Sequence, residues 1–128
     1  MKAYNAKDIR NIAIAGHSGR GKTTLAEAML FLAKATDRLG RVADGNTVLD
    51  FDAEEKRRKV TIATAMAAFD WNNTKINLLD TPGLFDFAGG VSEGMRAAES
   101  ALIVLAAGSG VDVGAEKAYK AASERKIA

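Results

Sequence analysis

Short apolar runs alternate along this chain with stretches in which apolar residues recur at helical spacing. The first run, Ile9 to Ala15 (IRNIAIA), is closed by Gly16, and it is typical of a strand buried on both faces of a parallel sheet. Apolar residues then recur at helical intervals from Leu25 to Leu32, among good helix formers. This spacing predicts a helix that begins at Lys22.

The pattern is lost between Thr36 and Val60, where charged residues and two glycines leave only scattered apolar positions. A long irregular segment inside a small domain is usually either functional or disordered. Strand-like runs follow at Thr61 to Trp71 and at Lys75 to Leu79, joined by an asparagine pair that tolerates positive φ. These two runs predict a β-hairpin.

The alternation continues to the end of the chain. Ala88 to Ser100 has helical spacing despite three glycines that weaken its first half, Ala101 to Ala107 (ALIVLAA) is strand-like, and Ala115 to Lys126 is again helical. The order of elements predicts an α/β fold in one domain, residues 1–128. We expect a mostly parallel sheet with helices on both faces and one antiparallel hairpin strand at its edge.

Composition narrows the chemistry. The 128 residues include no cysteine and one histidine, which excludes a disulfide scaffold, a zinc finger, a thiol nucleophile and a histidine-rich metal site. The net charge of +2 is too small to indicate a nucleic-acid partner, and no apolar run approaches membrane-spanning length. We therefore expect a cytoplasmic protein with no membrane partner and no DNA partner.

A phosphate-binding motif lies between the first strand and the first helix. GHSGRGKT satisfies the pattern G-x-x-x-x-G-K-[ST], in which backbone N–H groups and a helix N-terminus point at a phosphate. Lys22 is predicted to neutralise the β- and γ-phosphates, and the Thr23 hydroxyl suits Mg²⁺. The motif indicates a P-loop NTPase. The predicted nucleotide-binding residues here are Gly16, His17, Ser18, Gly19, Arg20, Gly21, Lys22, Thr23 and Thr24.

Two residues of this loop need separate interpretation. His17 follows the first glycine directly, so we interpret it as shaping the turn rather than as a general base. Arg20 is either a solvated side chain or an extra phosphate contact.

A carboxylate follows the KINLL run. Because the carboxyl ends of parallel strands share one edge of the sheet, Asp80 is predicted to anchor Mg²⁺ near the phosphate loop; the alternative is a carboxylate that caps a turn. Gly83 offers a pivot whose N–H group senses a γ-phosphate. The second predicted group of nucleotide-binding residues is Asp80, Thr81, Pro82 and Gly83.

These motifs carry a family resemblance. In chain order, the strings GHSGRGKTTL, DGNTVLDFDAEEKRRKVTI, INLLDTPGLFDF and SALIVLAAGSGV are similar to the GTP-binding domain of translational GTPases, especially elongation factor G and its elongation-factor-G-like paralogues. The resemblance implies GTP/GDP and Mg²⁺ as cofactors and the ribosome as partner. It also implies a first switch at Thr36 to Ile62, in which Thr61 joins Thr23 and Asp80 as a metal ligand, and a second switch that opens with Asp80 to Gly83.

Three positions depart from the family pattern. Leu84 takes the place of the histidine that positions the attacking water, Gly19 that of an aspartate, and Lys59 that of a glycine. An isobutyl group cannot orient water, so hydrolysis is either slow or depends on another group. The departures favour a divergent paralogue.

The resemblance predicts a GTPase in which water attacks the γ-phosphate in line, with Lys22, Thr61 and Gly83 serving the reaction. One alternative is a ribosomal-protection or release-factor GTPase. Another is a nucleotide-dependent binding regulator with little hydrolysis, which Leu84 supports. A third is an ATP-using P-loop enzyme.

The guanine-recognition motif Asn-Lys-x-Asp does not occur in the chain. We expect the N-terminal part of a GTP-binding domain, ending before the guanine-recognition strand and binding nucleotide weakly with little purine preference. Ala101 to Ala107 would then be an exposed edge, so we expect dimerisation or strand exchange through it. The basic run Lys56 to Lys59 is either a solvated face or a contact for ribosomal RNA.

Overall fold

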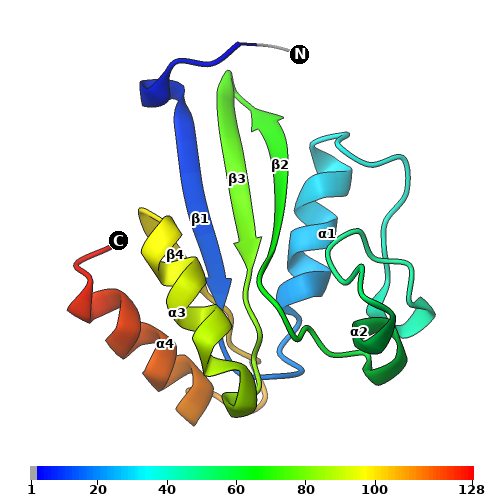
Figure 1. Cartoon of the computed structure of the whole chain (residues 1–128), viewed down its shortest axis with the longest axis vertical. Coiled ribbons are helices and arrows are strands. Elements are labelled where there is room, and N and C mark those ends of the chain that lie inside the picture. Colours follow the sequence, from blue (N-terminus) through cyan, green and yellow to red (C-terminus); the bar gives the residue numbers. More distant parts are fainter. Residues whose placement is uncertain (1–2) are drawn as a thin grey trace.

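The computed structural model describes residues 3–128, which form a four-stranded sheet with helices on both sides (Figure 1). The strands are β1 (Ile9–Ala15), β2 (Ala65–Trp71), β3 (Thr74–Asp80) and β4 (Ser100–Ile103). Their order in the sheet is β2-β3-β1-β4. β1 is parallel to both β3 and β4, and β2 runs antiparallel to β3. The predicted α/β fold, with a mostly parallel sheet and an antiparallel hairpin strand at its edge, is confirmed.

Two helical layers cover the sheet. The helices are α1 (Lys22–Leu32), α2 (Ala53–Arg58), α3 (Ala88–Ala97) and α4 (Val113–Glu124), with 3₁₀ turns η1 (Ala6–Asp8), η2 (Val42–Asp44) and η3 (Phe85–Phe87). Ile14 and Leu78 pack with α1, whereas Ala13 and Leu79 pack with α3 and α4 (Figure 1). This alternation along each strand is what buries both faces of the sheet. None of the described helices is long and apolar enough to cross a membrane.

The sheet is most deeply buried where β1 and β3 end. The last three residues of β1 and of β3 are buried, while the earlier residues of both strands are at least partly exposed. The phosphate loop follows the end of β1, and the DTPG segment (residues 80–83) begins at the last residue of β3. The two predicted motifs therefore start from the most deeply buried part of the sheet.

The hairpin is confirmed, but it begins later than predicted. The two asparagines of its turn both have positive φ, at 46° and 62°. β2 starts at Ala65 rather than at Thr61. The backbone before it is held elsewhere, because the N–H groups of Ile62 and the following residue donate to the Glu55 carboxylate.

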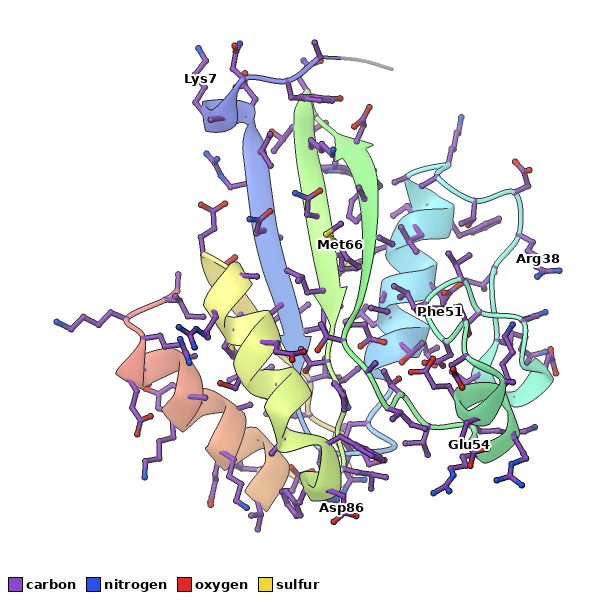
Figure 2. The ribbon with its side chains drawn as sticks, viewed as in Figure 1. Lys7, Arg38, Phe51, Glu54, Met66 and Asp86 are labelled. Carbon is purple, nitrogen blue, oxygen red and sulfur yellow. The ribbon has the colours of Figure 1, made fainter. Side chains whose placement is uncertain are left out.

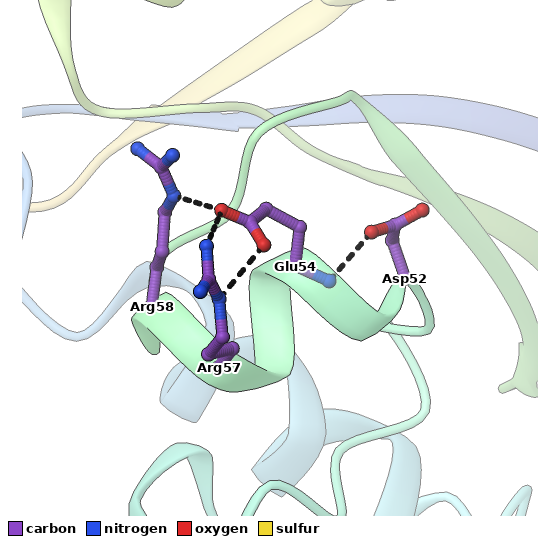
Figure 3. A network of polar contacts seen from close by, with 4 residues as sticks. All are labelled: Asp52, Glu54, Arg57 and Arg58. Carbon is purple, nitrogen blue, oxygen red and sulfur yellow. Dashed lines mark hydrogen bonds and ion pairs between the residues drawn. The ribbon is translucent and has the colours of Figure 1, made fainter.

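The irregular segment contains a helix that periodicity missed. Asp52 is the N-cap of α2. Its side chain accepts the N–H of Glu54, and the Glu55 side chain accepts the N–H of Asp52. This reciprocal capping box satisfies backbone donors that a helix start leaves unpaired. Figure 3 shows the cap and, one turn later, the guanidinium groups of Arg57 and Arg58 gathered on Glu54. Six residues are too few for an apolar period to show.

Two of the three glycines of α3 allow close packing. A Cβ on Gly94 would lie 2.5 Å from Cγ2 of Thr81, and one on Gly90 would lie 2.8 Å from the ring of Pro82. Larger residues at these two positions would push α3 away from the DTPG segment. Gly90 and Gly94 weaken the local helix propensity of α3, but they let the helix pack closely against the DTPG segment.

The edge strand is shorter than predicted. β4 ends at Ile103 rather than continuing to Ala107. Its outer edge is partly occupied by the chain itself: the N–H of Ala101 donates to the carbonyl of Ala128 at 2.6 Å, and the N–H of Ala128 donates to the carbonyl of Glu99 at 3.4 Å. The predicted dimerisation or strand exchange therefore finds no support in the structure.

Replacing a buried leucine of β3 tests the packing. Leu78 is 1% exposed and Leu32 is 69% exposed. We expect Leu78→Ala to lower the free energy of unfolding by about 2 to 5 kcal/mol, and Leu32→Ala to change it by about 0.5 kcal/mol or less. Urea denaturation of both variants measures the difference. Equal losses in the two variants would contradict this account of the core.

Candidate functional site

The phosphate loop turns from β1 into α1 through three glycines. Gly16, Gly19 and Gly21 have φ of 135°, 74° and 87°, which side chains with a Cβ rarely adopt. A Cβ on Gly16 would also lie 2.6 Å from the carbonyl oxygen of Val104, so the backbone after β4 backs directly onto the loop. Gly21 is the N-cap of α1, and the first N–H groups of that helix therefore face the loop.

A cavity of about 210 Å³ opens beside this loop. Its walls come from the phosphate loop, from the irregular segment after α1 and from the DTPG segment. The sequence predicts that these three segments form one nucleotide site. The lining residues are Ser18, Gly19, Gly21, Lys22, Thr23, Thr24, Val42, Asp50, Lys59, Val60, Thr61 and Gly83.

Lys22 is a buried residue of this cavity wall. It is 6% exposed, and its ammonium donates to the carbonyl of His17 at 3.0 Å. Burial lowers the pKa of Lys22, while the nearby carboxylates of Asp80 and Asp112 act in the opposite direction. A Cβ on Gly83 would clash with Nζ of Lys22, so the glycine lets the DTPG backbone close over the lysine.

Two threonines and two aspartates form a buried chain beside Lys22. The Thr23 hydroxyl donates to Oδ2 of Asp80 at 2.5 Å and lies 3.0 Å from the Thr61 hydroxyl. Thr61 in turn donates to Oδ1 of Asp50 at 2.8 Å. All four residues are buried. The structure therefore brings together Thr23, Thr61 and Asp80, which are separated by up to 57 positions along the chain.

One oxygen of the Asp80 carboxylate accepts no hydrogen bond. Its Oδ1 is buried without a hydrogen-bond partner. Burial raises the pKa of Asp80 to about 7, against the opposing effects of the Thr23 hydroxyl and the Lys22 ammonium. A buried carboxylate oxygen beside two hydroxyls is a set of hard oxygen donors that suits Mg²⁺, whose remaining ligands are usually waters and phosphate oxygens. The residues present fit that cation.

Sequence analysis missed three carboxylates that hold the irregular segment. Asp50 accepts from Thr61 and Thr47, and burial raises its pKa. Glu27 on α1 accepts the N–H groups of residues 48 and 49, and Glu55 accepts those of residues 62 and 63. The capping-box spacing could have revealed Glu55. No local signal marks Glu27, because its partners lie more than 20 positions away.

His17 and Arg20 do not line the cavity. The His17 ring lies 5.6 Å from the Phe85 ring, and its backbone packs on α4 so closely that a Cβ on Gly114 would be 2.6 Å from its Cα. Arg20 pairs with Asp112, the N-cap of α4, at 2.9 Å. The backbone of His17 and the side chain of Arg20 thus join the loop to α4.

Thr81 and Pro82 lie behind the cavity. The Thr81 hydroxyl donates to the carbonyl of Ile14 at 2.7 Å. Pro82 is fully buried and faces α3 at Gly90. These two residues hold the DTPG segment against β1 and α3.

Leu84 does not line the cavity beside the phosphate loop. It lines a second cavity, of about 240 Å³, between the segment after β3, α3 and α4, together with Phe85, Val91 and Lys117. The ammonium of Lys117 lies 4.1 Å from the centre of the Phe85 ring.

Comparison with known proteins finds a family match and several relatives. Residues 7–128 match the family described as the Elongation factor Tu GTP binding domain. The Elongation factor G-like protein of Mycobacterium tuberculosis is 48% identical over 104 residues, which cover 81% of this chain and 15% of that protein. The mitochondrial Ribosome-releasing factor 2 of Yarrowia lipolytica is 43% identical over 128 residues, covering 97% of this chain and 16% of that protein.

A solved structure shares the fold closely. A crystal structure of a protein from Thermus thermophilus superposes with a TM-score of 0.90 at 39% identity, covering 93% of this chain and 18% of that protein. The chain thus spans less than one fifth of the length of each of these three relatives.

The raised pKa of Asp80 predicts how stability depends on pH in metal-free buffer. The folded protein keeps a proton on Asp80 up to about pH 7, whereas the unfolded chain releases it near the ordinary value of 3.8. This group's contribution is therefore complete below the unfolded pKa and is lost as pH rises to about 7, a loss on the order of 4 kcal/mol. Urea denaturation at several pH values in chelator should show a smaller loss for Asp80→Asn. Identical pH profiles for the two proteins would overturn the assignment.

Proposed function

Because this chain belongs to the Elongation factor Tu GTP binding domain family, we propose that the protein is a Mg²⁺-dependent GTPase that acts on the ribosome. The names of its relatives, an elongation factor G-like protein and a ribosome-releasing factor, support a role in translation. A cytoplasmic location is proposed with that role. Guanine specificity is proposed from the family, since the Asn-Lys-x-Asp motif is absent from the chain.

The observation that carries the proposal is the convergence of three chain segments on one buried oxygen cluster. Thr23 comes from α1, Thr61 from the first switch (residues 36–62) and Asp80 from the end of β3, and adjacent oxygens are 2.5 to 3.0 Å apart. The proposed Mg²⁺ would be held by Thr23 and Thr61, with Asp80 anchoring it. When bound there, the cation would supply charge neutralisation for the β- and γ-phosphates.

The chain's own groups bind and orient the phosphates. Backbone N–H groups of the phosphate loop and the Lys22 ammonium would hold the nucleotide and balance charge that develops during transfer. Gly83, whose missing Cβ leaves room for Lys22, would present its N–H to the terminal phosphate. This contact gives the second switch a reason to move when that phosphate leaves.

The attacking water needs another partner than residue 84. Leu84 has no polar side-chain atom and lines the cavity between α3 and α4 instead of the phosphate cavity. Intrinsic hydrolysis is therefore proposed to be slow, with positioning supplied by another group. The same observation supports the second candidate, a nucleotide-dependent binding regulator that hydrolyses little.

Removing Lys22 tests the binding site. We expect Lys22→Ala to weaken GTP binding at least about a hundredfold, because a charge-assisted phosphate contact is lost. Titration with a fluorescent GTP analogue measures this. The matched control is Lys120→Ala, on the exposed face of α4, which should bind as the unaltered protein does. Unchanged binding in Lys22→Ala would mean that the phosphate loop is not the site.

Restoring a histidine at residue 84 separates the two candidate functions. In single-turnover assays with and without ribosomes, a working GTPase should show ribosome-stimulated hydrolysis with leucine in place. A binding regulator should bind GTP without turnover, and Leu84→His should raise its rate by about 100- to 10,000-fold, as expected when a positioned acid-base group is supplied. Absence of turnover in both proteins, even with ribosomes, would contradict the GTPase proposal.

A further inference from the structure

Lys59 occupies an unusual backbone position at the end of α2. Its φ of 56° and ψ of 39° are left-handed, a conformation that suits glycine better than lysine. Lys34 and Lys126 share this conformation at φ of 58° and 55°. The backbone alone therefore does not set Lys59 apart from two other lysines, and its distinguishing feature is where the side chain goes.

The Lys59 side chain joins two parts of the first switch beside the phosphate cavity. Lys59 is exposed and lines that cavity, and its ammonium donates to the carbonyl of Ala43 in η2. Val42, the neighbour of Ala43, lines the same cavity. Lys59 therefore links the end of α2 to η2 beside the space that the phosphates would fill.

Its basic neighbours are directed elsewhere. Arg57 and Arg58 are both paired with the Glu54 carboxylate (Figure 3), and both arginine side chains are exposed. Lys56 does not line the phosphate cavity. Figure 2 shows Glu54 at the periphery of the molecule, on the same segment as Phe51. Within the basic run from Lys56 to Lys59, only Lys59 lines the phosphate cavity.

The electrostatics favour a phosphate as the partner of Lys59. The ionisable side chains that line the cavity are Lys22, Lys59 and Asp50, and the Asp50 carboxylate is engaged by Thr61 and Thr47. The Lys59 ammonium has three donors and meets a neutral carbonyl, whereas a phosphate oxygen is a charged and stronger acceptor.

We propose that Lys59 is a phosphate-binding residue, a second cation that the first switch adds to Lys22 for the terminal phosphate of a nucleoside triphosphate. The inference rests on the proposed function, since it needs nucleotide in this cavity. It gives the first switch a direct, charge-based contact with the phosphate that distinguishes triphosphate from diphosphate.

Two substitutions separate charge from backbone. Lys59→Met keeps the long side chain and the left-handed backbone but removes the charge, whereas Lys59→Gly removes the charge and also favours the backbone. We expect both variants to bind GTP about tenfold more weakly in Mg²⁺, with GDP affinity changed less than about twofold. Lys59→Arg should retain most of the GTP affinity.

The matched control is Lys34→Gly, which removes a lysine from the same backbone conformation at the end of α1. Its GTP and GDP affinities should stay unchanged. The GTP affinity of Lys59→Met should also fall less steeply with added salt, because one ion contact has been removed. Thermal unfolding of each variant shows that the fold is intact.

The outcomes are distinct. If the unaltered protein binds GTP and Lys59→Met binds GTP and GDP with unchanged affinities and salt dependence, the inference is wrong while the proposed function stands. Equal weakening for GTP and GDP would make Lys59 a structural tie through Ala43 and also overturn the inference. If the unaltered protein binds neither nucleotide, the proposed function is wrong, and the inference that rests on it is wrong as well.

Discussion

The short hydrogen bond between the Thr23 hydroxyl and the Asp80 carboxylate is the contact on which the site depends. It joins the start of α1 to the end of β3 in the most deeply buried part of the sheet. Thr61 adds the first switch to this pair, and Asp50 holds Thr61 in place. Polar groups buried this completely are costly unless they are paired, so each of these segments is constrained by the others.

The first switch is held mainly by carboxylates rather than by an apolar core. Leu49 is a buried hydrophobic residue of this segment. Glu27, Asp50 and Glu55 each accept two hydrogen bonds from it, and one of the two that Glu55 accepts is the capping bond from Asp52. Segments with few buried apolar contacts open at lower cost than core strands. This way of ordering the segment suits a switch, because a few polar contacts can be exchanged without disturbing the sheet.

Local sequence determined much of the fold. The phosphate-loop glycines and the asparagine turn follow from the backbone preferences of single residues, and the apolar run of β1 reflects burial on both faces, so their sequence patterns predicted them correctly. The placement of Asp80 at the carboxyl edge followed from parallel pairing, which is a general property of such sheets. The boundaries of β2 and β4 could not be predicted in this way. Glu55 accepts backbone N–H groups of the segment before Ala65, and β4 ends at Ile103, opposite the last residue of β1, Ala15.

The sequence by itself determined that this chain has a phosphate loop, a strand-end aspartate and a family pattern that joins them, because glycine backbone freedom is a property of single residues and a buried strand is marked by its apolar run. Only the tertiary structure decided where the unusual residues point. Arg20 pairs with Asp112, Leu84 turns toward α3 and α4, and Lys59 lines the phosphate cavity. A long side chain can reach partners far away in the sequence, and only the folded backbone fixes which of them is near.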